Sequence, residues 1–320
     1  MKAIVYQEYG SPDALSLREV PTPTPREGEV LIAVRATGLN AADRYLLRGR
    51  PAFLRLSSGL RRPKNPILGA DVAGEVVAVG SGVTSFTTGD AVYGDLSGCG
   101  LGGLAEYVCA PAELLASPPA NLTAIEAAAV PMAGVTALQA LRDKGRVQPG
   151  QRVLIYGASG GVGTFAVQLA RALGAEVTAV CSPRHHETAA ALGAARVFDY
   201  SQAALPPDGY DLILAINGYR PLREYRQAVA PGGIVVVVGG AMRQIFGAML
   251  LGPLAGGDRT VSNQMARPNG ADLAFLTGLM EAGQVRPVVE RCYPLAETAA
   301  AFRSLEQAHA RGKVVISVAG

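Results

Sequence analysis

The segment IYGASGGVGTFAVQLA, residues 155–170, constrains the fold of this chain more than any other part of it. An apolar run is followed by closely spaced glycines and then by apolar residues at helical spacing, which predicts a strand, a tight turn and a helix. A second predicted strand, 176–181, follows at the distance expected of a βαβ unit. The order predicts a parallel sheet and leaves two uses for the turn: a dinucleotide site, or only a tight strand-to-helix connection.

Three glycines have separate roles in the dinucleotide interpretation. Gly157 permits a tight turn after the strand, Gly160 lets the backbone approach a pyrophosphate, and Gly163 lets the helix lie close to the sheet. The first N–H groups of the following helix, together with its dipole, attract phosphate. We therefore favour a dinucleotide site over a plain turn. Its predicted contacts are Gly157, Ala158, Ser159, Gly160, Gly161, Val162 and Gly163.

Composition excludes several classes of protein. The chain has 320 residues, of which 49% are hydrophobic and 17% charged, so about two domains with large cores are expected. A net charge of +3 argues against nucleic acid as a partner. The basic cluster Arg61, Arg62 and Lys64 is predicted to be a solvated loop, with a mouth for an anionic ligand as the alternative.

The sequence also suggests where the protein works. The start of the chain resembles a strand rather than a signal peptide, and no apolar run approaches the ~20 residues that cross a bilayer. The four cysteines are scattered, without a C-x-x-C pair. We expect a cytoplasmic protein in a reducing compartment, without a membrane partner.

The pattern changes near residue 121. Before it, short β-branched runs separated by turns predict an all-β barrel or sandwich. After it, strands and helices alternate, which predicts a doubly wound parallel sheet. A capping box, Thr123 with Glu126, marks the transition. The tail could complete the sheet of either domain. The predicted strands after residue 121 are 152–156, 176–181, 196–200, 211–216, 234–238, 287–293 and 313–318, and the predicted helices are 164–173, 186–192, 222–230, 271–282 and 296–309.

The end of the second strand selects the coenzyme. The sequence there is CSPRHH, and no carboxylate occurs before Glu187 to accept hydrogen bonds from the ribose of NAD. Ser182 can donate to a 2′-phosphate and Arg184 can neutralise it, which favours NADPH. The alternative for Arg184 is a surface charge at a helix start. His185 and His186 are expected to be surface residues at the helix entry rather than metal ligands.

In these residues and in several longer motifs, the chain resembles the medium-chain dehydrogenase/reductase superfamily, and within it the zinc-free quinone oxidoreductase branch. The resemblance implies an α/β protein with a GroES-like β-barrel domain and a Rossmann domain, with the active site in the cleft. The implied boundaries are 1–121 completed by 288–320, and 122–287 for the NADP-binding domain. A homodimer is implied, through an edge strand such as 234–238 or a neighbour. The motifs that carry the likeness are GLNAADRYLLRG (38–49), ILGADVAGEVVAVGSGV (67–83), GDAVYG (89–94), AAAVPMAGVTALQAL (127–141), VLIYGASGGVGTFAVQLARALGAEV (153–177), VCSPRH (180–185), FDY (198–200) and RGKVVISV (311–318).

The resemblance also shows where this chain departs from zinc-dependent alcohol dehydrogenases. Asn40 stands where their first ligand cysteine would be, Ala70 stands where a histidine would be, and PMAG, 131–134, supplies no cysteine. Zinc needs about four converging donors, so we expect no metal. Without a Lewis acid, quinones and conjugated enones are easier acceptors of hydride than simple ketones. The predicted activity is NADPH-dependent reduction of a quinone or an activated C=C bond. The alternatives are a zinc-independent carbonyl or alcohol oxidoreductase, a specialised biosynthetic reductase, and an NADPH-binding sensor without activity.

Asn40 and Tyr45 are the predicted catalytic residues. They match the pattern N-x-x-D-x-Y of the zinc-free branch, and the resemblance implies that both lie beside the nicotinamide. The hypothesis is that both orient the substrate carbonyl and that Tyr45 or water returns the proton. The alternatives are a turn residue for Asn40 and packing against the coenzyme for Tyr45. Asp43 is expected to brace the loop rather than to react.

The remaining contacts with the coenzyme are spread along the chain. The resemblance implies Thr136 at the nicotinamide end and Tyr200 on the adenosine side. Asn217, Gly239 and Gly240 follow strands, at the carboxyl ends where dinucleotides bind. Lys313 is predicted to reach the phosphates, or else to be a surface lysine. A small hydrophobic substrate is expected to contact Phe53, Leu54 and Leu56 and the stretch 242–254 beginning with Met242, although core packing explains these apolar residues almost as well.

Overall fold

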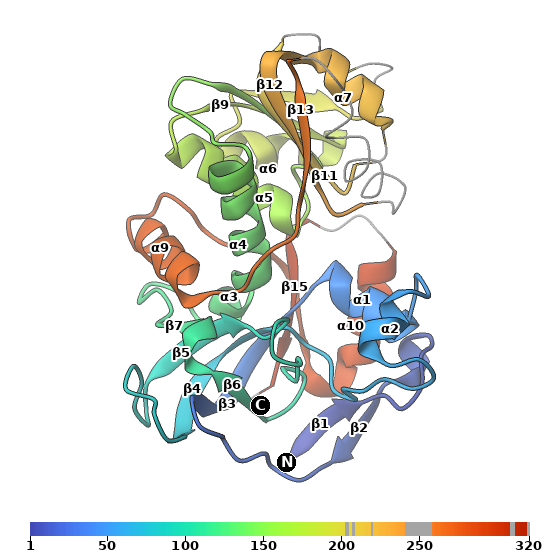
Figure 1. Cartoon of the computed structure of the whole chain (residues 1–320), viewed down its shortest axis with the longest axis vertical. Coiled ribbons are helices and arrows are strands. Elements are labelled where there is room, and N and C mark those ends of the chain that lie inside the picture. The colour runs from blue at the N-terminus through green and yellow to red at the C-terminus, as the bar shows by residue number, and fades with distance from the viewer. Residues whose placement is uncertain (202–204, 207–208, 219, 241–257, 308–310, 319–320) are drawn as a thin grey trace. The chain divides into compact units, whose positions relative to one another are not determined.

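The computed structural model (Figure 1) describes the chain except for residues 202–204, 207–208, 219, 241–257, 308–310 and 319–320. It divides into two compact units. Unit 1 comprises residues 1–132, 268–281 and 287–320, and unit 2 comprises residues 133–267 and 282–286.

Unit 1 is built on a sheet in the order β14-β15-β3-β4-β5-β7, in which β6 also pairs with β3. The pairs are antiparallel except for β14 with β15. Along residues 29–34 of β3 half-buried and buried residues alternate, since successive side chains point to opposite faces of a strand. The elements of unit 1 are β1 (Lys2–Val5), β2 (Ser16–Glu19), β3 (Glu29–Leu39), α1 (Ala41–Arg48), α2 (Leu54–Ser58), β4 (Asp71–Val79), β5 (Ala91–Asp95), β6 (Tyr107–Pro111), β7 (Leu115–Ala116), α3 (Ala124–Ala128), α9 (Gly270–Glu281), β14 (Val289–Pro294), α10 (Thr298–Glu306) and β15 (Lys313–Ser317).

The C-terminal tail completes the sheet of unit 1. β15 pairs with β3, so that β15 and β14 extend one side of a sheet made largely by the first 120 residues. Helix α9 also belongs to unit 1, whereas the sequence-based boundaries placed it in the second domain. Two hydrogen bonds hold it there: the Tyr93 hydroxyl donates to the Leu273 carbonyl at 2.8 Å, and the Asn121 amide donates to the Met280 carbonyl at 3.0 Å.

Two helices interrupt the region predicted to be all β. Helix α1 begins after Asn40 and ends at Gly49, which adopts the left-handed conformation. The Asn40 backbone N–H donates to the Asp43 carboxylate at 2.8 Å, one half of a capping box. Both helices are short, which explains why helical periodicity did not reveal them. The capping box of Thr123 and Glu126 at the start of α3 is confirmed.

Unit 2 is a parallel sheet in the order β10-β9-β8-β11-β12-β13. Numbered within the unit, this is 3-2-1-4-5-6, the order of a doubly wound dinucleotide-binding sheet. The predicted parallel α/β sheet is therefore confirmed. The elements of this part of the chain are α4 (Pro131–Gln139), which begins in unit 1, a π-helical turn (Ala140–Lys144), β8 (Arg152–Tyr156), α5 (Gly161–Ala172), β9 (Glu176–Cys181), α6 (His186–Ala191), β10 (Arg196–Asp199), β11 (Tyr210–Ile216), α7 (Leu222–Ala228), β12 (Val229–Val238) and β13 (Thr260–Gln264).

Some element boundaries in unit 2 differ from the predictions. Helix α5 begins at Gly161 rather than at residue 164, and β12 begins at Val229, where a helix was predicted. β13 lies in a segment predicted to be irregular. Because β13 pairs with β12, the segment 234–238 is not an edge strand, and that part of the dimer prediction is wrong. β13 is the outermost strand on this side of the described sheet.

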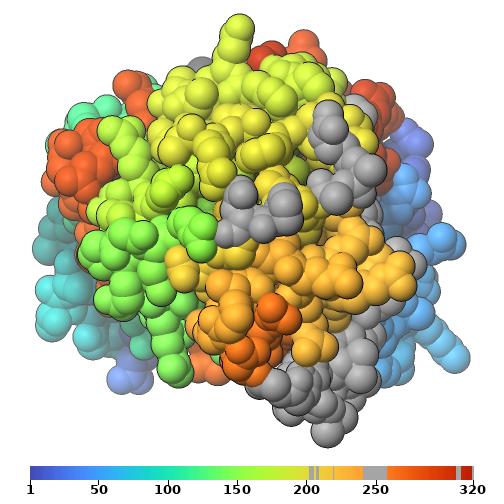
Figure 2. Space-filling model, turned by 90° about the horizontal axis from the view of Figure 1, so that it is seen from above, coloured from blue at the N-terminus to red at the C-terminus, as the bar shows by residue number. Residues whose placement is uncertain are grey.

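The core of unit 2 explains its apolar strands. Side chains of β8, β9, β11 and β12 pack with Tyr225 of α7 into one buried cluster. The face seen in Figure 2 is formed largely by yellow-green to amber segments, between about residue 180 and residue 235. A sheet covered on both faces accounts for the nearly continuous hydrophobic strands seen in the sequence.

Within the described ranges, no helix has the length and apolar character needed to cross a membrane. All four cysteines are free thiols.

Candidate functional site

Three neighbouring strands of unit 2 end in unusual backbone conformations at one edge of the sheet. β8 is followed by Gly157 with φ +83°, β11 by Asn217 with φ +49°, and β12 by Gly239 with φ +64°. The Asn217 N–H donates to the Val238 carbonyl at 2.9 Å, so these ends lie side by side. Ligands of doubly wound sheets bind outside the carboxyl ends of the strands, where the strand order reverses between β8 and β11.

The three glycines of the turn after β8 have different steric surroundings. A Cβ on Gly163 would lie 2.1 Å from the Gly157 carbonyl oxygen, so only glycine lets α5 pack this closely on the turn. A Cβ on Gly157 would lie 2.3 Å from the Ile216 carbonyl oxygen. A Cβ on Gly160 would meet nothing nearer than 3.7 Å, so this position leaves open space at the first turn of α5. The conformational roles predicted for these glycines agree with the structure, and phosphate binding stays a prediction.

The other residues of the turn differ in exposure. Ala158 is buried and its N–H donates to the Val180 carbonyl at 3.2 Å, which fixes the turn against β9. Ser159, Gly161 and Val162 are half-buried. The first N–H groups of a helix have no partner within it, so the start of α5 offers donors beside the open space at Gly160.

The predicted 2′-phosphate residues lie at the end of β9. Ser182 is half-buried and Arg184 is exposed, while Tyr200, 45% exposed, donates its N–H to the Cys181 carbonyl at 3.2 Å. His185 is buried, so the expectation of a surface residue is wrong for it, and His186 is half-buried.

Asp199 is an acidic residue at this edge that sequence reasoning did not consider. It ends β10, in register with Cys181 at the end of β9. Its carboxylate accepts hydrogen bonds from the Ser201 hydroxyl at 2.6 Å and from the Ser201 N–H at 2.9 Å. These bonds lower the pKa of Asp199. Each carboxylate oxygen thus accepts one bond from Ser201 and keeps a further acceptor site.

Thr136 and Gly240 complete the predicted contacts of unit 2. Thr136 is buried in α4, and Gly240 has φ +98° directly after Gly239. A Cβ on Gly239 would meet nothing within 4 Å, so the end of β12 also has open space.

Unit 1 contains a buried network of polar side chains around Asp71. The Lys313 ammonium donates to Asp71 Oδ2 at 2.9 Å and to Asn40 Oδ1 at 2.6 Å. The Asn40 amide donates to Asp71 Oδ2 at 3.0 Å and to the Gly38 carbonyl at 3.4 Å. The other carboxylate oxygen of Asp71 accepts the Met132 N–H at 2.8 Å. Asp71 is fully buried, Lys313 is 3% exposed and Asn40 is 9% exposed.

This network changes the interpretation of two predicted residues. Lys313 is not a surface lysine, and its ammonium is bonded to Asn40 and Asp71 rather than extended toward a phosphate. The Asn40 amide already donates to two partners, so it would have to leave one of them to orient a substrate carbonyl. The geometry makes Asn40 a bridge between a lysine and an aspartate.

Asp43 connects this network to the start of α1. Its carboxylate accepts the Asn40 N–H at 2.8 Å and the Gly69 N–H at 3.2 Å, so the expected bracing role is confirmed. Burial, only partly offset by these bonds, raises the pKa of Asp43 to about 7. Burial likewise raises the pKa of Asp95, the register partner of Asp71, to about 6.

These two carboxyl groups predict a pH-dependent stability. A pKa raised above its value of 3.8 means that the folded protein holds the proton more tightly than the unfolded chain. The free energy of unfolding should therefore fall by about 1 kcal/mol or more as pH rises from about 4 to about 7. Urea unfolding at several pH values measures it, and Asp43→Asn should reduce the slope. Asp143→Asn, at a half-exposed carboxyl, is the control.

Stability that rises between pH 5 and pH 7 would contradict the prediction, because the carboxyls with lowered pKa, Asp13, Asp199 and Glu306, titrate below this range.

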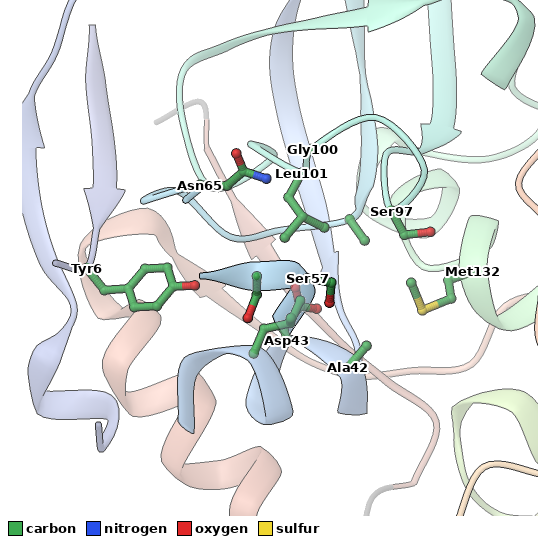
Figure 3. Close-up of a pocket in the computed structure, with 12 residues that line it drawn as sticks. Tyr6, Ala42, Asp43, Ser57, Asn65, Ser97, Gly100, Leu101 and Met132 are labelled. Carbon is green, nitrogen blue, oxygen red and sulfur yellow. The ribbon is translucent and has the colours of Figure 1, made fainter. Parts of the chain in front are cut away.

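A cavity of about 210 Å³ opens beside Asp43 in unit 1. Figure 3 shows the Tyr6 ring and Met132 toward opposite ends of it, with Asp43 between them. The lining combines apolar Ala42, Leu46, Leu101 and Met132 with polar Asp43, Asn65 and Ser97. Its volume is below the ~300 Å³ at which most ligand pockets begin, so it suits a small group or one end of a larger ligand.

Tyr45 lies apart from this cavity. It lines a second, more open hollow with Arg44, Arg48, Arg50, Pro51 and Glu306, and the Arg44 guanidinium lies 5.0 Å from its ring centroid. Within the described part of the chain the Tyr45 hydroxyl makes no hydrogen bond. Asn40, the other predicted catalytic residue, lines neither of these two hollows, so the structure does not bring the two residues together at one of them.

The predicted substrate contacts lie on or next to α2. Phe53 is 44% exposed, Leu54 is half-buried and Leu56 is 72% exposed, so core packing is not their role. None of them lines the cavity beside Asp43, although Ser57 and Ser58 of the same helix do. Met242 lies outside the described residues.

Asp71 is the main residue that sequence reasoning missed. It follows Ala70 in LGADVAG, at the start of a strand whose first residues are all buried. A charged residue in a buried apolar strand requires a partner. That requirement could have predicted a buried cation, although not that the cation comes from Lys313.

Comparisons with known proteins agree with the two-part architecture. A family model described as an alcohol dehydrogenase GroES-like domain matches residues 26–120, and one described as a zinc-binding dehydrogenase matches residues 192–316. The chain is 35% identical to the chloroplast envelope quinone oxidoreductase homolog of Arabidopsis thaliana, over 99% of this chain and 98% of that protein. It is 34% identical to the NADPH-dependent alkenal/one oxidoreductase of the same plant, over 99% and 79%. The structure of a quinone oxidoreductase from Coxiella burnetii is similar, with a TM-score of 0.88, 30% identity and coverage of 100% and 99%.

Proposed function

Because this chain belongs to the medium-chain dehydrogenase/reductase superfamily and is an NAD(P)H-dependent oxidoreductase, we propose that it uses NADPH to reduce a quinone or an activated C=C bond without a metal. The observation that carries the proposal is the glycine turn of unit 2, which combines a closely packed helix start with open space at Gly160. The relatives named for quinone and alkenal/one reduction support the substrate class.

The turn fits a dinucleotide. Residues 157–163 would hold the pyrophosphate by their N–H groups, because the first turn of α5 supplies unpaired donors and a partial positive charge. Asn217, Gly239 and Gly240 would line the nicotinamide half at the ends of β11 and β12, together with Thr136. Ser182 and Arg184 would hold the 2′-phosphate, with Tyr200 beside the adenosine. The bound coenzyme would supply the hydride.

The residues present do not fit a zinc ion. Asn40 and Ala70 occupy the ligand positions that the resemblance identifies, and both lie outside the segment matched by the zinc-binding family model. The Asn40 side-chain oxygen already binds the Lys313 ammonium at 2.6 Å. Among the described residues, no group of three or more His, Cys, Asp and Glu side chains could hold a metal. We therefore propose that the reduction is independent of a metal.

Without a metal, the acceptor itself has to delocalise the negative charge that hydride transfer creates. When hydride reaches the β-carbon of an enone or a quinone ring, the negative charge spreads into an enolate, for which ordinary hydrogen-bond donors are sufficient. The Tyr45 hydroxyl has no partner in the described structure and is our proposed donor, with Asn40 as a positioning residue that fixes the end of β3. Phe53, Leu54 and Leu56 would contact an apolar, uncharged substrate.

The proposal is tested by following NADPH absorbance with a panel of quinones, enones and aldehydes. We expect turnover with the first two classes, retained after treatment with a chelator, and a clear preference for NADPH over NADH. Arg184→Ala should raise the KM for NADPH about 10- to 100-fold, the value of one charged hydrogen-bonding group, with little change for NADH. Tyr45→Phe tests the hydroxyl in the same assay.

Three results would contradict parts of the proposal. Turnover of aldehydes alone would identify a carbonyl or alcohol oxidoreductase. Tight NADPH binding without turnover of any class would identify a sensor. A preference for NADH that Arg184→Ala leaves unchanged would overturn the coenzyme assignment.

Assembly and location remain proposals of the same kind. We propose a homodimer through the outer strand β13 of unit 2, since an unpaired strand edge offers N–H and C=O groups to a second copy. The free thiols suit a reducing compartment such as the cytoplasm.

A further inference from the structure

Unit 1 exposes large apolar side chains next to a group of cations. Phe53, Leu56 and Leu60 are 44%, 72% and 67% exposed, and Arg61, Arg62 and Lys64 follow them, all exposed. We call these six residues the α2 surface. Single exposed apolar residues are ordinary, but three within eight residues, beside three cations, form a patch that needs a function.

The charge of this region is strongly one-sided. Seven of the 29 basic residues of the chain lie between residues 44 and 64, and no acidic residue occurs between residues 44 and 70. The other 22 basic residues are outnumbered by the 26 acidic ones. The small net charge of the whole chain therefore conceals one strongly basic segment in an otherwise slightly acidic protein.

The cations of the α2 surface differ from two neighbouring arginines, which have partners within unit 1. Arg48 binds Glu306 and Arg55 donates to the Gly49 carbonyl at 3.0 Å, so these two stabilise unit 1 itself. Arg61, Arg62 and Lys64 form no ion pair with any residue in the described ranges. Within these ranges no acidic side chain neutralises their charge.

The backbone of this segment is nevertheless held in place by contacts with Tyr9. The Tyr9 hydroxyl hydrogen-bonds the Ser58 hydroxyl at 2.9 Å and donates to the Gly59 carbonyl at 2.6 Å. The Arg55 guanidinium lies 4.6 Å from the Tyr9 ring centroid. Gly59 is buried while Leu56 and Leu60 on either side of it are exposed, so the fold anchors the backbone and presents these side chains to the outside.

We propose that the α2 surface docks unit 1 onto an anionic lipid bilayer. Phe and Leu side chains flanked by Arg and Lys are the composition of peptide surfaces that lie in the membrane interface, with the apolar groups in the acyl boundary and the cations among the headgroups. Leu56 and Leu60, 72% and 67% exposed, line neither hollow described above, so most of each side chain faces outward. Protruding apolar groups suit a fluid hydrocarbon layer better than a protein surface.

Docking of this kind agrees with the absence of a spanning helix in the described residues. The expectation of no membrane partner rested on the lack of a long apolar run, which does not bear on peripheral binding. Docking would bring the enzyme to hydrophobic acceptors dissolved in the bilayer, and in this respect it rests on the proposed function. The binding itself does not.

The test is co-sedimentation of the full-length protein with vesicles, without coenzyme or substrate. Vesicles of phosphatidylcholine alone are compared with vesicles containing 30% phosphatidylglycerol. We expect binding to the anionic vesicles only, weakening as NaCl rises from 50 to 500 mM. Arg61→Gln/Arg62→Gln/Lys64→Gln should lower the partition coefficient about a hundredfold, at roughly fivefold per cation, and Leu60→Ser should lower it further.

Matched variants control for total charge and for exposed leucine. Arg142→Gln/Lys144→Gln/Arg146→Gln removes three exposed cations from unit 2, and Leu17→Ser changes a leucine that is 45% exposed. Both should bind vesicles like the wild type. The triple variant at 61, 62 and 64 should keep its turnover of a water-soluble quinone. If turnover is absent in all proteins but vesicle binding follows these expectations, the proposed function fails and the docking stands.

Other outcomes would overturn the docking. Equal sedimentation with both vesicle types, or equal loss in the two triple variants, would mean that the α2 surface does not recognise anionic lipid. Self-association that Leu60→Ser abolishes, without vesicle binding, would assign the surface to a second copy. A raised KM for a soluble quinone in Leu60→Ser, with no vesicle binding in the wild type, would assign it to the substrate.

Discussion

Replacing Gly163 by alanine is expected to destabilise unit 2 by about 3 kcal/mol and to abolish NADPH binding. The added Cβ would lie 2.1 Å from the Gly157 carbonyl oxygen and 2.7 Å from the Ala158 carbonyl carbon. Both are backbone atoms that cannot move without displacing the turn from β8, and overpacking of this kind typically costs about 1–3 kcal/mol or more. Urea unfolding followed by circular dichroism measures the first effect, and calorimetric titration with NADPH measures the second.

Gly160→Ala is the matched control, because it separates packing from binding. Its φ of −78° suits any residue, and its Cβ would lie 3.7 Å from the nearest atom. The protein should therefore keep its stability within about 1 kcal/mol, the usual range for a change at a helix N-cap. If the open space receives a pyrophosphate, the same methyl group should weaken NADPH binding at least 10-fold. Undiminished NADPH binding by a folded Gly160→Ala protein would show that the turn only connects β8 to α5 and does not bind the pyrophosphate.

Lys313→Met is expected to have the largest effect in unit 1. The change removes the cation bound to Asp71 and leaves a carboxylate that is fully buried. Removing one partner of a buried ion pair typically costs about 3–5 kcal/mol, because the remaining charge stays out of water. The unfolding midpoint in urea should fall accordingly, and Lys313→Arg should restore part of it.

Arg35→Met is the control for this ion pair. Arg35 and Glu75 form a bridge at 3.4 Å, with side chains 53% and 46% exposed, and exposed pairs contribute about 0–1 kcal/mol. A Lys313→Met protein as stable as the wild type but weakened for NADPH would return Lys313 to the phosphate-binding role first predicted for it.

The predictability of the fold followed the length of each element. In unit 2 the strands 152–156 and 176–181 match β8 and β9, because long apolar runs between glycine turns leave few alternatives. The helices α1 and α2 were missed because eight and five residues do not establish a helical period. β13 was missed because TVSNQ has too few apolar residues to predict a strand. Its strand conformation is instead stabilised by backbone pairing with β12.

The candidate site was predictable where backbone geometry decides it. The glycines after β8 could be interpreted from spacing alone, since a Cβ either fits or does not. Lys313 was misinterpreted because a lysine in a sequence gives no indication of burial. Its environment is made by Asn40 and Asp71, which lie more than 240 residues earlier and meet it only through the pairing of β15 with β3. Long-range electrostatic partners are set by sheet topology, which local pattern does not encode.

The position of β15 has a consequence for biosynthesis. Chains emerge from the ribosome N-terminus first and generally fold one domain at a time. Unit 1 departs from that order, since its strand β3 pairs with β15 and the residues of unit 2 are translated between these two strands. Until β15 is translated, Asp71 lacks its counter-ion Lys313, so we expect unit 2, whose residues all precede β15, to fold before unit 1 is complete.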